Sequence, residues 1–319
     1  MKVLITGGGG FVGSHLSEAL LARGDEVFIL EAGGTHKVRH LLGHPRFRIV
    51  RDSVMSMDIL DSLIAQVDLV YHLAAVVGVE HYVGDPYEVL NVNVNGTQNV
   101  LKVAFKYGKK VVFSSTSEVY GRNPKLPWSE DDDRVLGSTR IDRWCYSTSK
   151  AVGEHFCFAY HKLGLPVTIT RYFNVYGPRL DKIDVGRIIT IFMGQLLRDE
   201  PLTVIGDGMQ TRCFTYIDDA VKATIAAGMN EGTNGEVFNI GTDVETSILD
   251  LAKMMIEVSG SKSTIKFVTK EQVYGTSYED IARRVPDATK MRKVLGLTAE
   301  VPLREGLAQT IDWFRTQQQ

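Results

Sequence analysis

Near its beginning the chain reads Val3-Leu-Ile-Thr-Gly-Gly-Gly-Gly-Phe-Val-Gly13. The first four of these residues predict a short strand, and residues 11–23 have the apolar spacing of a helix. Gly7, Gly10 and Gly13 lie between the two elements, where glycines let the backbone turn tightly and approach a pyrophosphate at the helix N-terminus. A glycine run alone is a weak signal, but its position at the first strand-to-helix turn favours dinucleotide binding.

Apolar runs alternate with helical stretches over the rest of the first half. The predicted strands are 26–30, 47–50, 69–73, 110–113, 167–171 and 237–240, and the predicted helices include 86–107, 146–163 and 247–258. This alternation predicts an α/β fold, a doubly wound parallel sheet with helices on both faces. The chain is expected to leave the sheet near Gly177, return near Val237 and leave again near Ile265, where a polar, loop-like stretch runs to about Arg284.

The points at which the chain leaves the sheet and returns to it predict two domains. Residues 1–176 and about 237–264 would form the dinucleotide-binding domain, and residues 177–236 and 265–319 a smaller, mixed α/β substrate lobe. Such a lobe would cover the carboxyl edge of the sheet, where open α/β sheets bind ligands.

The composition narrows the classes of protein. The 319 residues are 44% hydrophobic and carry a formal net charge of -2, which does not favour a nucleic-acid partner. Cys145, Cys157 and Cys213 have no metal-ligand spacing, so we expect no metal and a reducing compartment. Because no apolar run reaches signal-peptide or membrane-spanning length, we expect a cytoplasmic protein without a membrane partner.

Tyr146 and Lys150 are four residues apart, on one face of a predicted helix. A lysine ammonium beside a phenol lowers the phenol's pKa, which would make Tyr146 a usable base. The pair is common by chance, but here it follows a strand that ends in the polar stretch Ser114-Ser-Thr-Ser-Glu-Val-Tyr-Gly121. A hydroxyl of Thr116 or Ser117 could bond the oxygen that becomes a carbonyl, and Glu118 could move a proton one carbon further on.

Glu31 follows the second strand, where an acidic side chain can bond the adenosine ribose hydroxyls and repel a 2′-phosphate. This position favours NAD over NADP as the cofactor. The other expected cofactor contacts lie after the strands and around the catalytic pair: Phe11, Val12, Asp52, Ser53, Val54, Leu73, Ala74, Ala75, Asn93, Ser114, Tyr146, Lys150 and Tyr172.

Four motifs occur together: the glycine stretch 6–13, the stretch 115–121, Tyr146-x-x-x-Lys150 and Arg171-Tyr-Phe-Asn-Val-Tyr-Gly-Pro-Arg179. This set resembles the extended short-chain dehydrogenase/reductase family, which contains NAD-dependent nucleotide-sugar epimerases, dehydratases and decarboxylases. The resemblance covers nearly the whole chain. It implies a Rossmann domain, a tightly bound NAD that is recycled in each turnover, and a homodimer built on the helices near 88–107 and 146–163.

The resemblance also implies the substrate contacts. Asn174 and Arg212 would bind the nucleotide diphosphate, and residues 203–205 would line the base. Arg284 would lie over the active site, with Arg283 as the alternative. The full expected set for the nucleotide-sugar, which is expected to be UDP-linked, is Glu80, Tyr82, Asn174, Arg179, Arg187, Thr203, Val204, Gln210, Arg212 and Arg284.

In all these enzymes a tyrosine takes the proton of the sugar 4-hydroxyl while hydride leaves C4 for NAD. Simple 4-epimerases usually carry a small residue at the position of Glu118, and 4,6-dehydratases commonly carry Asp where Ser117 stands. Glucuronate decarboxylases carry Ser-Glu, as here, and a β-keto acid loses CO2 readily.

Six stretches (43–47, 143–146, 177–181, 198–204, 212–215 and 278–280) resemble UDP-glucuronate decarboxylases and related enzymes, whereas residues 172–176 are closer to epimerases. We therefore rank UDP-glucuronate decarboxylation first, UDP-sugar 4-epimerisation second and 4,6-dehydration third. An NAD-sensing regulator would typically lose the Tyr–Lys pair, and a purely structural subunit would not need Asn174, Arg212 and Arg284 together.

Overall fold

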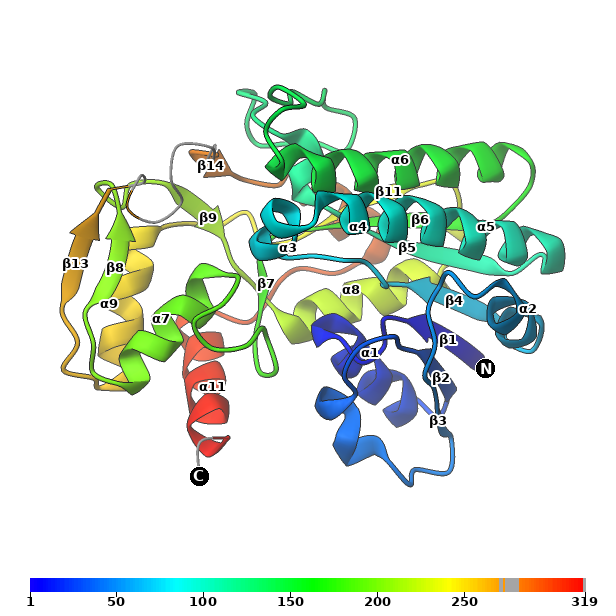
Figure 1. Cartoon of the computed structure of the whole chain (residues 1–319), viewed down its shortest axis with the longest axis horizontal. Helices are drawn as coiled ribbons and strands as arrows, with labels where there is room; N and C mark the ends of the chain where they lie inside the picture. The colour runs from blue at the N-terminus through cyan, green and yellow to red at the C-terminus, as the bar shows by residue number, and fades with distance from the viewer. Residues whose placement is uncertain (270–271, 273–280, 318–319) are drawn as a thin grey trace.

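The computed structural model describes the chain except residues 270–271, 273–280 and 318–319. Seven strands form one parallel sheet in the order β11-β6-β5-β4-β1-β2-β3 (Figure 1). All seven are strands that the sequence predicts. Their bounds are β1 Lys2–Thr6, β2 Glu26–Leu30, β3 Phe47–Val50, β4 Leu69–His72, β5 Lys110–Thr116, β6 Val167–Tyr172 and β11 Val237–Ile240.

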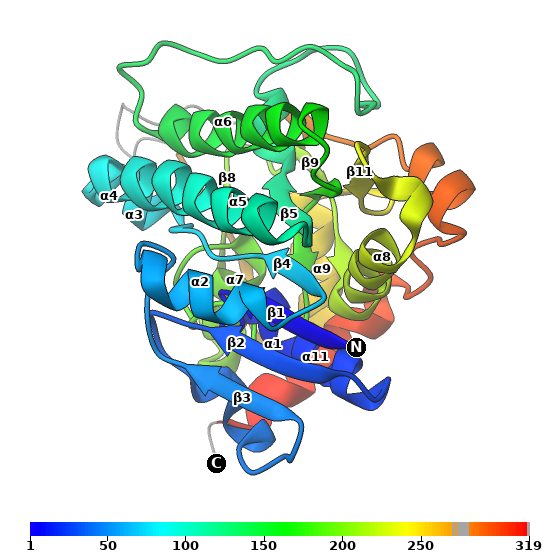
Figure 2. The ribbon, with the colours of Figure 1, turned by 90° about the vertical axis from the view of Figure 1, so that its right-hand side faces the viewer.

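Helices cover both faces of this sheet, which confirms the expected doubly wound, Rossmann-like α/β fold (Figure 2). On one face α1 packs against α8, and on the other α5 packs against α2 and α6. The predicted helix 86–107 is a continuous helical stretch made of α4, a π-helical segment at Asn91–Asn95, and α5. The bounds are α1 Phe11–Ala22, α2 Met57–Ala65, α3 Val79–Gly84, α4 Pro86–Leu90, α5 Gly96–Tyr107, α6 Arg143–Lys162 and α8 Ile217–Met229.

The strands of the sheet are buried on both sides, which explains why they read as continuous apolar runs. In β1, Val3 and Ile5 lie in the core between the sheet and α1, whereas Leu4 lies in the core on the opposite face. Because successive side chains of a strand alternate between faces, each core needs its own apolar set.

The second lobe lies at the left of Figure 1. It holds short sheets in which β8 pairs with β13, β9 lies between β12 and β14, and β7 pairs with β10. Its helices include α7 Ile188–Leu197, α9 Ile248–Ser259 and α11 Leu303–Thr316. The strands are β7 Val175–Tyr176, β8 Leu202–Ile205, β9 Thr211–Cys213, β10 Thr215–Tyr216, β12 Glu245–Ser247, β13 Ile265–Val268 and β14 Arg283–Arg284.

The expectation of a loop-like stretch from about 265 to 284 is wrong at both ends. Residues 265–268 form β13, because the backbone pairs in parallel with β8, and residues 283–284 pair with β9. The motif at 278–280 lies outside the described residues.

The two-domain division stays a prediction, and helix packing bears on its boundaries. α8, expected in the substrate lobe, packs against β5, β6 and β11 of the main sheet. α9, expected with the dinucleotide-binding domain, packs against α7, α11 and β8.

Candidate active site

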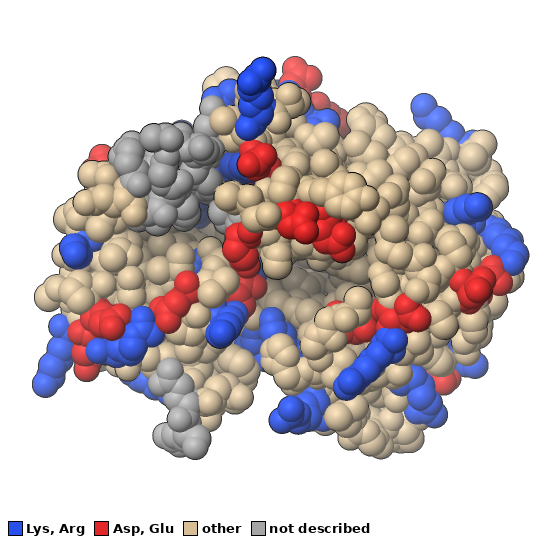
Figure 3. Space-filling view, in the orientation of Figure 1, with Lys and Arg blue, Asp and Glu red and all other residues tan. Residues whose placement is uncertain are grey.

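A cavity of about 870 Å³ lies between the carboxyl ends of the main strands and the second lobe. Figure 3 shows it as a hollow near the middle of this face. Loops that follow β1, β2, β4, β5 and β6 line one side, and residues from β8, β9 and β14 line the other. Open α/β sheets bind their ligands at this edge.

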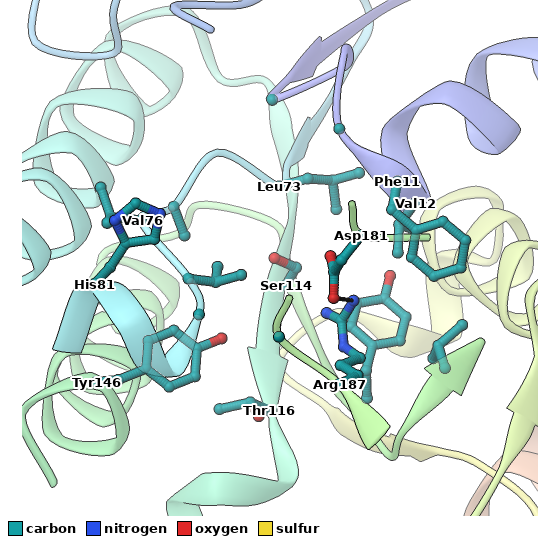
Figure 4. A pocket seen from close by; sticks show the side chains of 18 of the residues that line it. Phe11, Val12, Leu73, Val76, His81, Ser114, Thr116, Tyr146, Asp181 and Arg187 are labelled. Atoms are coloured by element: carbon teal, nitrogen blue, oxygen red, sulfur yellow. Dashed lines mark hydrogen bonds and ion pairs between the residues drawn. The ribbon is translucent and has the colours of Figure 1, made fainter. Parts of the chain in front are cut away.

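Glycines shape one end of the cavity. Gly7 has a φ of +72°, and a Cβ there would lie 2.7 Å from the backbone nitrogen of Ala74. A Cβ on Gly13 would lie 2.5 Å from the carbonyl oxygen of Gly7. α1 begins after Gly10 without a side-chain cap, and Phe11 and Val12 of its first turn border the cavity (Figure 4). The uncapped helix N-terminus and the bare loop fit a dinucleotide diphosphate.

Glu31 lies at the same end and is held by the glycine loop. Its carboxylate accepts hydrogen bonds from the backbone N–H of Gly9 at 2.9 Å and of Gly33 at 2.8 Å. A negative charge fixed here suits ribose hydroxyls and disfavours a 2′-phosphate.

Sixteen of the seventeen expected cofactor residues line the cavity. They are Gly7, Gly10, Phe11, Val12, Gly13, Glu31, Asp52, Ser53, Val54, Leu73, Ala74, Ala75, Ser114, Tyr146, Lys150 and Tyr172. Asn93 is the exception, because its buried amide bonds the backbone N–H and C=O of Val76 and the hydroxyl of Ser149. It therefore fastens the loop after β4 to α6.

Tyr146 and Lys150 lie in α6 and both line the cavity. The Lys150 ammonium donates to the carbonyl oxygen of Ser114 at 2.8 Å, and burial lowers the pKa of Lys150 to about 8. The expectation that the pKa of Tyr146 is lowered is wrong. Burial, and then the charge of Glu118, raise the pKa of Tyr146 to about 12.

Thr116, Ser117 and Glu118 also line the cavity, and Figure 4 shows Thr116 beside Tyr146. The carboxylate of Glu118 lies 2.5 Å from a guanidinium nitrogen of Arg284 and 3.2 Å from one of Arg143. Burial by itself raises the pKa of Glu118, but the two arginines outweigh burial and hold that pKa at about 2. Glu118 is therefore a charged carboxylate at neutral pH.

Seven of the ten expected substrate residues line the cavity: Glu80, Tyr82, Asn174, Arg187, Gln210, Arg212 and Arg284. Figure 4 shows Arg187 paired with Asp181, with 2.8 Å between the bonded atoms. The choice between the two C-terminal arginines is also clear, because Arg284 faces the cavity whereas the exposed Arg283 pairs with Glu245.

Arg179, Thr203 and Val204 are not among the lining residues. Arg179 bonds Glu18 and His15 of α1, and its own φ is +62°. The hydroxyl of Thr203 accepts from Gln195, and Val204 is fully buried in the core. Of β8, Ile205 lines the cavity instead.

Some lining residues were missed by the sequence interpretation. Arg143 precedes Tyr146 by three residues, so helical spacing could have placed it on the same face. The others carry no local pattern that points to the cavity, because they come from separate turns and strands: Lys37, Asp181, Phe214 and Ile248.

Two features are absent from the part of the chain that the structure describes. No group of three or more His, Cys, Asp or Glu side chains there could hold a metal ion. No helix there is long and apolar enough to cross a membrane.

Comparison with known proteins matches residues 3–241 to the NAD dependent epimerase/dehydratase family. The chain is 44% identical to a UDP-N-acetyl-alpha-D-glucosaminuronate decarboxylase of Bacillus cytotoxicus, over 98% of each protein. It is 38% identical to UDP-glucuronic acid decarboxylase 1 of Xenopus tropicalis, over 98% of the chain and 72% of that protein.

A solved structure has the same fold. The UDP-glucuronic acid 4-epimerase of Bacillus cereus, in complex with UDP-glucuronic acid and NAD, is 34% identical with a TM-score of 0.89. The match covers 99% of this chain and 100% of that one. The chain therefore belongs to the NAD dependent epimerase/dehydratase family and is an NAD-dependent enzyme of nucleotide-sugars, of the decarboxylase/epimerase kind.

Proposed function

We propose that this enzyme decarboxylates a UDP-linked hexuronate. The observation that carries the proposal is the Ser117-Glu118 pair beside Tyr146, with Glu118 between two buried arginines. Two guanidinium groups around one carboxylate leave a net positive charge, which favours a sugar that brings its own carboxylate. The hydroxyl of Ser117 is too weak an acid to protonate a leaving 6-hydroxyl, so dehydration is disfavoured.

The residues at the cavity can perform the first step. Tyr146 accepts the proton of the sugar 4-hydroxyl, and Thr116 can bond the same sugar oxygen. Lys150, four residues further along the helix, is the cation that stabilises the Tyr146 phenolate. NAD, when bound against the glycine loop and Glu31, accepts the hydride that leaves C4.

Decarboxylation then needs little from the protein. With a ketone at C4, the C6 carboxylate belongs to a β-keto acid, so the C5–C6 bond breaks and its electron pair passes to an enolate at C5, C4 and O4. CO2 leaves, and a proton from solvent takes its place at C5. Arg284 is placed to hold the C6 carboxylate until the bond breaks.

The relative with 44% identity acts, by its name, on the N-acetylated hexuronate, so we favour UDP-N-acetylglucosaminuronate as the substrate over UDP-glucuronate. The second candidate function is 4-epimerisation of UDP-glucuronate, which the likeness to the Bacillus cereus epimerase favours.

The test is incubation of the purified protein with NAD and each hexuronate in turn, followed by chromatography and mass spectrometry. Loss of CO2 is expected from one or both substrates, and none from Tyr146→Phe. An unchanged mass at a new retention time would replace decarboxylation by epimerisation. No change with either acid would contradict both functions.

We further propose a cytoplasmic homodimer built on α5 and α6. Phe105 of α5 and Leu163 at the end of α6 are apolar and exposed, by 43% and 66%, which a dimer interface would explain. Light scattering should give twice the mass of one chain for the wild type, and the mass of one chain for Phe105→Asp. Fractionation of the source cells tests the compartment.

A further inference from the structure

Glu118 is held by two arginines that come from different parts of the chain. Arg143 is the first residue of α6, and one of its terminal nitrogens lies 3.2 and 3.3 Å from the two carboxylate oxygens. Arg284 belongs to β14, and one of its terminal nitrogens lies 2.5 Å from Oε1. All three side chains are at least 86% buried, so water screens these charges little.

The two arginines are not equivalent. Both arginines line the cavity, and the buried Nε of Arg284 has no hydrogen-bond partner among the described residues, so Arg284 has donor capacity left for a ligand. Arg143 donates to both carboxylate oxygens of Glu118, whereas Arg284 lies against Oε1, and the Arg143 guanidinium also lies 5.6 Å from the ring centre of buried Trp144. It also lies one helical turn before Tyr146, in the same helix.

A substrate carboxylate at Arg284 would compete with Glu118 for that guanidinium. If Glu118 lost both arginines, it would be an unpaired buried charge, which costs several kcal/mol or forces the group to take up a proton. The other titratable groups that influence Glu118, Tyr146 and Tyr82, are neutral phenols that cannot replace a cation.

We propose that Arg143 is a positioning residue, which retains the charged Glu118 carboxylate when Arg284 exchanges Glu118 for the carboxylate of the sugar. The inference rests on the proposed function, because only a hexuronate brings a second carboxylate. It assigns the two arginines separate tasks, with Arg284 facing the substrate and Arg143 facing Glu118.

The test measures the protons taken up when a ligand binds, so that it does not depend on turnover. Enzyme loaded with NADH is titrated with UDP-glucuronate in an isothermal calorimeter near pH 6.5, in buffers of different ionisation enthalpy. UDP-glucose, which lacks the carboxylate, is titrated in parallel. The variants are Arg143→Met, Arg143→Lys and, as the matched control, Arg140→Met, since Arg140 is exposed three residues earlier.

Arg143→Met is expected to take up about one proton per UDP-glucuronate and none with UDP-glucose, because its Glu118 must be neutralised when Arg284 leaves. Wild type, Arg140→Met and Arg143→Lys should take up close to none, and adding Glu118→Gln to Arg143→Met should abolish the uptake. The inference is overturned if Arg143→Met binds UDP-glucuronate without proton uptake, or if it loses affinity for both ligands equally. Wild type that binds both hexuronates but, when loaded with NAD, releases CO2 from neither would refute the proposed function alone.

Discussion

The ring of Tyr82 lies face to face on the ring of Tyr146, with 4.9 Å between the ring centres and 9° between the planes. Tyr82 belongs to the short helix α3, and Tyr146 to α6. The stack shields the proposed base from water and leaves it 9% exposed. Since burial is the largest cause of its raised pKa, α3 helps to set the proton affinity of Tyr146.

This stack leads to a prediction for Tyr82. Tyr82→Ala should let water reach Tyr146 and lower its pKa from about 12 toward the ordinary value of about 10. Since the base acts when ionised, the rising limb of the pH profile of kcat/KM, which reports the free enzyme, should move to lower pH. Tyr82→Phe keeps the ring and should retain the wild-type profile. Tyr87→Ala, at an exposed position on α4, is the control, and an unmoved limb in Tyr82→Ala would refute the prediction.

Lys150 should lower the stability of the ligand-free protein. Its folded-state pKa of about 8 lies below its unfolded value, so the unfolded chain binds the proton more tightly. The free energy of unfolding therefore rises with pH from about 8 to about 10.5, and is lowest with respect to this group below pH 8.

Lys150→Met should raise the free energy of unfolding at pH 6.5 by up to about 3 kcal/mol, and with it the melting temperature. The same change should abolish turnover. The gain in the free energy of unfolding should become smaller above pH 9. Thermal melts at several pH values test this, with Lys162→Met at the exposed end of α6 as the control. A melting temperature below wild type at pH 6.5 would show that the bond from Lys150 to Ser114 outweighs the burial cost.

Gly13→Ala should weaken NAD binding by at least about tenfold, because the added Cβ would lie 2.5 Å from the carbonyl oxygen of Gly7 and displace the loop. Fluorescence titration with NADH measures the affinity. Gly84→Ala is the matched control, since its Cβ would meet nothing within 4 Å. Equal affinity in the two variants would show that the loop tolerates the added methyl group.

Glu31→Ser should shift the preference between the two nicotinamide cofactors. The change removes the charge that repels a 2′-phosphate and the two bonds to Gly9 and Gly33, so NADH should bind about tenfold more weakly and NADPH more tightly. Competitive titration gives the ratio of the two affinities. Glu26→Gln, at the start of β2, should leave that ratio unchanged, and an unchanged ratio in Glu31→Ser would exclude Glu31 as the selecting residue.

Much of the fold and the site was predictable from local patterns. The seven strands of the main sheet, the glycine turn and the Tyr146–Lys150 spacing all depend on residues close together in the sequence. β13 was missed because its central residues, Lys266 and Phe267, are exposed and its pairing with β8 is not encoded locally. Asn93 and Arg179 have the right types for ligand contacts, but the fold engages them elsewhere.

The sequence by itself determined which segments form strands and helices, where the cofactor loop lies and which helix face carries the base. Side-chain periodicity and glycine placement extend over one or two turns, so they can be recognised in the sequence alone. Only the tertiary structure decided that Arg143 and Arg284 share Glu118 and that Tyr82 covers Tyr146. These contacts join residues from separate elements, and their charges and burial, which set the pKa values at the site, exist only after the chain has packed.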